Sequence, residues 1–142
     1  MAVVSVYNHT ALRFINGSNS PTDTYKLMLC TSSTFDATNT TLAGITKTEV
    51  ATGNGYVATG KALTNTAVAT VTTNDAKFSA DNVEWLVNTA SISANSAILY
   101  NDTDADDPPV FHIDFGGTRT VLPGNTFGII WSADGVYKFN IT

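Results

Sequence analysis

The chain has 142 residues, of which 43% are apolar and only 13% charged, about half of the roughly 25% charged residues usual in soluble domains. This length suits a single domain, in which folding buries roughly 70% of the surface of the unfolded chain. The formal charge is −5 and the seven basic residues are scattered, which argues against nucleic-acid binding, because phosphate contacts need clustered Lys and Arg.

The polar residues are mainly Thr, Ser and Asn. Thr suits the pleated surface of a sheet, and Asn and Ser suit turns, so this composition favours a β protein with many short turns. The first ten residues, MAVVSVYNHT, lack a cationic segment followed by a long apolar run, and we expect no signal peptide. No segment approaches the roughly 20 apolar residues of a membrane span, so we expect no membrane partner.

The chain is expected to begin with an arm or a short helix. Residues 8–17 (NHTALRFING) offer Asn8 or Thr10 as a helix cap and Gly17 as a stop, which predicts one or two helical turns or else an extended arm. We therefore divide the chain into an N-terminal arm or short helix of residues 1–21 and a β domain of residues 22–142.

The first clear strand is predicted at residues 24–31 (TYKLMLCT), where apolar and polar residues alternate. It contains Cys30, the single cysteine, so no intramolecular disulfide can form. We expect a buried or half-buried inert thiol, because nothing nearby in sequence would stabilise a thiolate. A long polar loop follows at residues 32–44, with a short helical turn expected at 41–45.

Turn signals divide the middle of the chain into short strands. Asn54-Gly55 and Gly60 indicate turns or bulges, and Asn74-Asp75 predicts a tight hairpin. In the second strand of this hairpin, Trp85 shares one face with Val83 and Val87.

Four closing strands are expected near the C-terminus, separated by turns at Gly116-Gly117, Pro123-Gly124 and Asp134-Gly135. With a short buried strand at residues 96–100, the chain has about eight strands. Turn signals recur about every 8–12 residues, a spacing typical of sandwiches and barrels. The sequence predicts an all-β fold: a single-domain antiparallel β-sandwich or a jelly-roll-like barrel.

His112 and Asp114 are the first candidates for chemistry. In a strand, side chains alternate between two faces, so Phe111, Ile113 and Phe115 share the opposite face and will claim the core. His112 and Asp114 then lie outside, and we interpret them as a solvated polar pair rather than a proton-handling pair, which needs a concave pocket.

The acidic loop resembles the start of a calcium-binding loop. Asp102, Asp104 and Asp106 copy its first three ligand positions. However, Asp107 stands where the turn glycine belongs, and Ile113 stands where the bidentate glutamate belongs. We expect a solvated loop, and weak calcium binding is the alternative that stays open.

Three further features have structural explanations. Residues 52–61 (TGNGYVATGK) look like a phosphate loop but lack its GxxxxGK[ST] pattern, so turn glycines explain them better. Trp85 and Trp131 could stack a sugar or a base, but both lie on the apolar face of an alternating strand, which predicts core positions. His9 has no partner nearby in sequence. We therefore expect no catalytic residues, no cofactor and no metal.

Five segments stand in an informative order: EVATGNGYVATGKAL, FSADNVEWLV, SAILYND, FHIDFGG and GNTFGIIWSADGVYKF. In this order they resemble a family of small virion proteins of tailed bacteriophages. Members of that family carry GY-x-x-x-G-x-x-L, an acidic-Val-x-Trp strand, LYxD, IDFGG and I-x-W-x-x-x-G-[VI]-[YF]. The resemblance spans about Glu49 to Ile141, and the segment TYKLMLCTSS also fits. The N-terminal third and the Thr/Asn-rich loop at residues 31–41 depart from it.

The resemblance implies a structural protein of the virion, assembled in the host cytoplasm. The role it favours is a head decoration or cement protein that binds and stabilises the shell of the major capsid protein, as a dimer or trimer. It implies no catalytic residues. The alternatives are a tail, neck or fibre component, or a carbohydrate-binding module that attaches the particle to a cell. The last alternative needs exposed aromatic residues.

Overall fold

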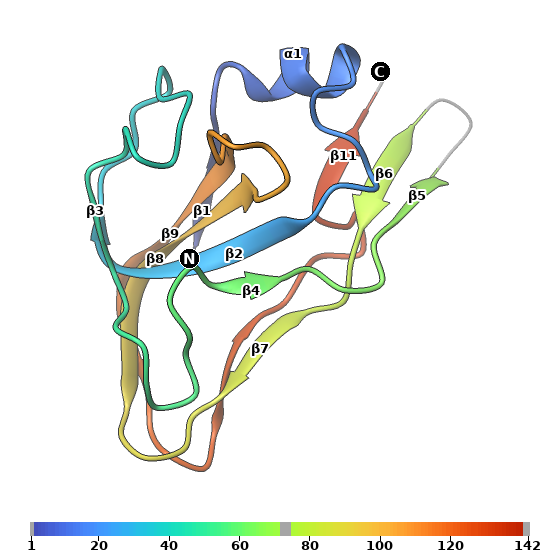
Figure 1. Cartoon of the computed structure of the whole chain (residues 1–142). Coiled ribbons are helices and arrows are strands. Elements are labelled where there is room, and N and C mark those ends of the chain that lie inside the picture. Colours follow the sequence, from blue (N-terminus) through green and yellow to red (C-terminus); the bar gives the residue numbers. More distant parts are fainter. Residues whose placement is uncertain (1, 72–74, 141–142) are drawn as a thin grey trace.

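A six-stranded antiparallel sheet forms the larger layer of the molecule (Figure 1). The computed structural model describes residues 2–71 and 75–140. The strand order is β1-β9-β8-β2-β3, and β4 pairs with β2 beside β3. The strands are β1 (Val3–Val6), β2 (Tyr25–Ser33), β3 (Lys47–Glu49), β4 (Lys61–Ala62), β8 (Ile92–Asn101) and β9 (Pro109–Val121).

Two small antiparallel sheets, β10-β7 and β11-β6-β5, make up the second layer. Their strands are β5 (Ala67–Thr70), β6 (Ala76–Ser79), β7 (Val83–Leu86), β10 (Thr126–Ile129) and β11 (Tyr137–Phe139). The predicted all-β, sandwich-like fold is confirmed, and no sheet of the described residues closes into a barrel. The described residues form eleven strands instead of about eight, because the second layer is built from short pieces.

The main core lies between the two layers. Strand alternation explains its composition, because every second residue of β2, β8 and β9 faces the second layer. Trp85 of β7 is only 4% exposed there, as the sequence predicted. Other buried members include Tyr25, Leu27, Leu29, Tyr56, Val87, Leu99, Phe111, Ile113, Phe115 and Phe127.

The large sheet is also covered on its other face, by the loop of residues 34–46. Leu42 and Ile45 of this loop pack with Tyr7 and with β2 and β8 side chains that include Cys30 and Ile98. The central strands are therefore buried on both faces and carry near-continuous apolar runs, as buried strands do. The helical turn expected within this loop is wrong, since residues 41–45 form turns and bends without a helix.

The segment expected to be an arm joins the main sheet through β1, which pairs antiparallel with β9. β1 is followed by the helix α1 (Thr10–Ile15). The helix ends before Gly17, whose φ angle is 80°. The N-cap is His9, not Asn8 or Thr10, and its side chain makes no capping bond. Instead, Thr10 Oγ1 donates to the carbonyl of Val110 at 2.8 Å. No helix of the described residues is long and apolar enough to span a membrane.

The turn predicted at Gly116-Gly117 is wrong, because β9 runs through both glycines to Val121. They form a bulge, where the register against β8 shifts between Ala94 and Ser96. The φ angles of Gly116 and Gly117 are 72° and 142°, and Asp114 Oδ1 accepts a hydrogen bond from Gly116 N at 2.8 Å. A glycine pair is typical of bulges as well as turns, so sequence alone does not separate them.

The other predicted turns are confirmed. Asn54-Gly55 closes a tight turn within a Gly53–Tyr56 bridge, and turns also lie at Gly124 and Gly135, where φ is positive. The predicted hairpin is confirmed in part by the pairing of β5 with β6. Its second strand ends at Ser79, and Val83–Leu86 form β7, which pairs with β10 in another sheet. Residues 72–74 of the predicted turn lie outside the described residues.

Candidate binding groove

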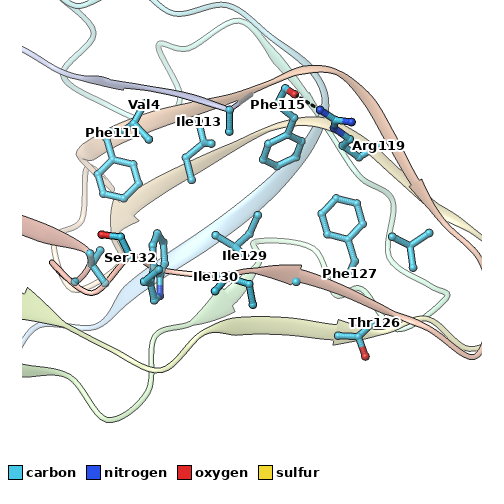
Figure 2. Close-up of a pocket in the computed structure, with 16 residues that line it drawn as sticks. Val4, Phe111, Ile113, Phe115, Arg119, Thr126, Phe127, Ile129, Ile130 and Ser132 are labelled. Carbon is cyan, nitrogen blue, oxygen red and sulfur yellow. Dashed lines mark hydrogen bonds between the residues drawn. The ribbon is translucent and has the colours of Figure 1, made fainter.

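An apolar groove of about 750 Å³ opens between the two layers. Figure 2 shows Phe111, Ile113 and Phe115 of β9 on one side of it, and Phe127 and Ile129 of β10 on the other. These five side chains point into the space between the strands. Phe111, Ile113, Phe115 and Phe127 are only 2–5% exposed, so they form the buried floor of the groove, and its accessible apolar surface lies at the mouth.

The groove exists because the second layer is short. β9 has thirteen residues, whereas β10, which faces part of it, has four and is followed by an irregular segment. Trp131 lies in that segment, half-buried and packed against the main core, so its predicted core position is confirmed only in part. Its ring meets Phe111 edge-on at 6.2 Å between centroids, and its Nε1 donates to the carbonyl of Asp81 at 2.9 Å.

Free strand edges border the groove on both sides. Among the described residues, β1 pairs only with β9 and β10 pairs only with β7. Tyr7 N donates to Val110 O, and in antiparallel alternation this directs the peptide N–H of Val4 away from β9. Likewise, Val87 N donates to Asn125 O, which directs the N–H of Gly128 away from β7.

Exposed apolar side chains surround the opening. Val4 is 56% exposed and Ile130 67%, and both line the groove. Such a continuous apolar surface marks an interaction site more often than a free surface.

A single charge stands at the groove. Among the described residues that line it, Arg119 is the one charged side chain. Its Nη2 donates to the carbonyl of Phe115 at 3.0 Å, just past the bulge of β9. This bond fixes the guanidinium beside an apolar wall, where it can pair with a carboxylate.

His112 and Asp114 do not form a solvated pair. Asp114 is exposed, as expected, but His112 is only 5% exposed, so its predicted outer position is wrong. The reason is the loop of residues 34–46, whose Phe35 ring lies 5.9 Å from the imidazole. Burial lowers the pKa of His112, and the nearby Asp114 carboxylate opposes this shift.

The polar partner of His112 is a serine that sequence reasoning missed. Ser33 Oγ lies 2.7 Å from His112 Nε2 and 2.5 Å from Ser96 Oγ. Ser33 is 79 residues away in sequence and matches no motif around the histidine, so no local signal could have found it.

The Ser33–His112 contact has the separation of a nucleophile and its base. However, the nearby Asp114 accepts a hydrogen bond from the amide of Gly116 in the bulge, and the imidazole of His112 is buried. The groove is lined by the residues on either side of His112 in β9, and so lies on the opposite face of the strand. The pair therefore satisfies buried polar groups and does not face the groove.

The acidic loop is engaged with cations of the chain itself. Asp104 Oδ2 lies 2.6 Å from Arg13 Nη2, and Asp102 Oδ2 lies 2.9 Å from Lys26 Nζ. The hydrogen bond from the Asp106 amide, helped by Arg13, lowers the pKa of Asp104. Within the described residues no group of three or more His, Cys, Asp or Glu side chains could hold a metal ion.

The remaining candidates have structural roles. Cys30 is fully buried, as expected, and burial raises the pKa of its thiol to about 12. The loop at 52–61 folds onto Glu49, whose Oε1 accepts bonds from Tyr56 Oη and the amide of Thr59. His9 does have a partner, since its Nε2 lies 2.8 Å from the carbonyl oxygen of Pro109.

Comparison of the chain with protein-family models, with curated proteins and with solved structures found no match in any of the three.

Proposed function

We propose that this chain is a non-enzymatic structural protein of a tailed-phage particle. Its role is that of a head decoration or cement protein, which binds and stabilises the shell of the major capsid protein. The order of the five sequence segments between Glu49 and Ile141 suggests the virion. The observation that carries the binding role is the open apolar groove beside the free edge of β1.

The exposed apolar side chains at the mouth of the groove favour a partner. A side chain such as Ile130, 67% exposed at the mouth of the groove, costs free energy in water that a docked protein surface recovers. The low charge of the chain is compatible with a crowded, repeated array on a shell, and copies of the chain pair or form trimers in this proposal.

The enzyme class is less well supported. Among the described residues, one arrangement sets a nucleophile beside a base: half-buried Ser33 contacts His112, which is buried beneath Phe35 of the 34–46 loop. It lies on the face of β9 opposite the groove. A substrate that entered the groove would not reach it.

Electron microscopy of intact virions tests the location. We expect density for this fold at regular positions on the head shell. Heads from a phage that lacks the gene should break at a lower temperature than normal heads. Adding the purified protein before heating should restore the normal breaking temperature. Density in the tail or neck would favour the alternative of a tail, neck or fibre component. Absence from purified particles would contradict the proposal.

A carbohydrate-binding module is the second candidate, and the half-buried position of Trp131 in the groove favours it, because sugars stack on exposed indoles. A glycan array separates the two functions. Specific binding to one glycan that Trp131→Ala abolishes would support the carbohydrate candidate, whereas a blank array leaves the capsid role as the better explanation.

A further inference from the structure

We propose that the groove accepts an extended β-strand donated by the capsid partner, which pairs with the free edge of β1 and completes the sandwich. This inference rests on the proposed function and specifies the chemistry of the docked segment: alternating apolar and polar residues, with one carboxylate placed to meet Arg119.

The unpaired backbone N–H groups beside the groove favour a peptide as the occupant. The N–H groups of Val4 and Gly128 point away from their paired strands, towards the open side of each layer. Unpaired strand edges are normally blocked by charge, proline or a covering loop. β1 has the sequence VVSV, with neither charge nor proline, and its valines are exposed. An added strand satisfies these peptide groups, as in other cases of strand addition.

The size of the groove suits a short strand. The four residues of β10 extend about 13 Å at the usual rise of about 3.3 Å per residue. A segment of about four to six residues therefore matches the length of this wall. Every second side chain of such a segment would face the mouth of the groove, where Val4 and Ile130 are 56% and 67% exposed above the buried floor.

Charge complementarity selects among occupants. Arg119 is the one charged residue of the described lining, so the segment that fills the groove should bring a carboxylate to it. A second copy of this chain that offers its own β1, Val3–Val6, brings no carboxylate. A fatty acid would satisfy Arg119 and the apolar wall but would leave the peptide groups of Val4 and Gly128 unpaired.

The first experiment measures binding of purified variants to phage heads that were assembled without this protein. Val4→Pro removes the outward N–H, and prolines are tolerated on edge strands, whereas the control Val4→Thr keeps the N–H and nearly the same shape. We expect Val4→Pro to weaken binding at least tenfold and Val4→Thr to have little effect. Arg119→Glu should also weaken binding at least tenfold, with Arg119→Lys retaining most of it. Circular dichroism and thermal unfolding check that each variant is folded.

The second experiment places a photo-crosslinker, p-benzoylphenylalanine, at Ile130 beside the groove or at the exposed control position Val57. After binding to heads, the Ile130 probe should capture a peptide of the major capsid protein that alternates apolar and polar residues and contains Asp or Glu. Capture of a second copy of this chain, or of a lipid, would overturn the inference.

The two proposals fail in distinguishable ways. If all variants bind heads as the unmodified chain does and only the Val57 probe captures capsid protein, strand donation is wrong and the decoration role stands. If the unmodified chain does not bind heads at all, both the decoration role and the strand donor are wrong.

Discussion

The surroundings of His112 favour the neutral form of its imidazole. It lies beneath Phe35 and beside Ser33, and burial lowers its pKa. A histidine with a lowered folded-state pKa binds a proton less readily in the folded chain than in the unfolded chain, whose value is about 6.5. Its contribution to stability is therefore complete above about pH 6.5 and is lost as the pH falls through the lowered pKa.

Replacing this residue should flatten the pH dependence of stability. In His112→Gln the amide can still bond Ser33 but does not titrate. The melting temperature of the unmodified protein should fall more steeply between about pH 7.5 and pH 5 than that of His112→Gln. Thermal unfolding followed by circular dichroism measures both slopes, and parallel slopes would contradict the neutral, buried imidazole.

Gly60 is a second residue whose surroundings set a strict requirement. It has a φ of +87°, and an added Cβ would collide with the carbonyl oxygen of Leu27. Gly17 has a similar φ of +80° but nothing near its Cβ position, so it is a matched control. We expect Gly17→Ala to cost about 1–2 kcal/mol of unfolding free energy from backbone strain alone, and Gly60→Ala to cost clearly more. Urea denaturation measures both free energies of unfolding. Equal losses would show that the β2 backbone at Leu27 moves aside at little cost and would contradict this prediction.

At the scale of elements, α1 is attached to the sheet by few contacts. Thr10 is fully buried, and its hydroxyl donates to Val110 O. Phe14 stacks on Tyr137 of β11 at 5.0 Å between ring centroids, and Arg13 pairs with Asp104 of the acidic loop. The helix has six residues, too few to be stable alone, so these contacts determine its position.

Removing the buried hydroxyl tests that attachment. Thr10→Val keeps the shape and removes this hydrogen bond, whereas the carbonyl of Val110 still accepts one from Tyr7 N at 3.3 Å. We therefore expect a loss of about 0.5–1.5 kcal/mol in unfolding free energy. Thr22→Val, at an exposed threonine, should change stability by no more than about 0.5 kcal/mol. Chemical denaturation provides both numbers, and a neutral Thr10→Val would mean that the hydroxyl adds nothing.

Strands were predictable from the sequence where apolar and polar residues alternate strongly. What covers each face of a strand was not predictable. The pattern around Phe111 and Ile113 correctly predicted which residues of β9 face the core. It could not predict that the other face would also be covered, because the covering loop of residues 34–46 is mostly polar and reaches the sheet through Leu42 and Ile45. His112 was misplaced for that reason.

At the scale of the whole molecule, the two tryptophans report on different environments. Trp85 is buried between the layers, whereas Trp131 lines the groove. In Trp85→Phe the emission comes from Trp131 alone and should be quenched strongly by acrylamide. In Trp131→Phe the remaining Trp85 should emit at shorter wavelength and resist quenching. Equal quenching of the two variants would contradict an open groove.

The groove itself could not be predicted from the sequence, because it depends on which strands pair at long range. Nothing in the segment around Trp131 indicates that β10 stops after four residues while β9 continues past it. The alternation in TFGIIW is the same whether the facing layer is complete or not, so Trp131 was assigned to the core.

The loop of residues 34–46 covers the main sheet, and this also limits which substitutions the loop can tolerate. Thr is the commonest residue of this stretch, which carries no recognisable motif. Yet Leu42 and Ile45 are buried, at 8% and 4% exposure, and complete a second core over β2 and β8. Random mutagenesis should find low tolerance at these two positions and at Phe35, whose ring contacts His112 and Tyr7, and higher tolerance at the exposed residues of the loop. A shortened loop would uncover Cys30 and Ile98, so its length is constrained as tightly as that of a strand.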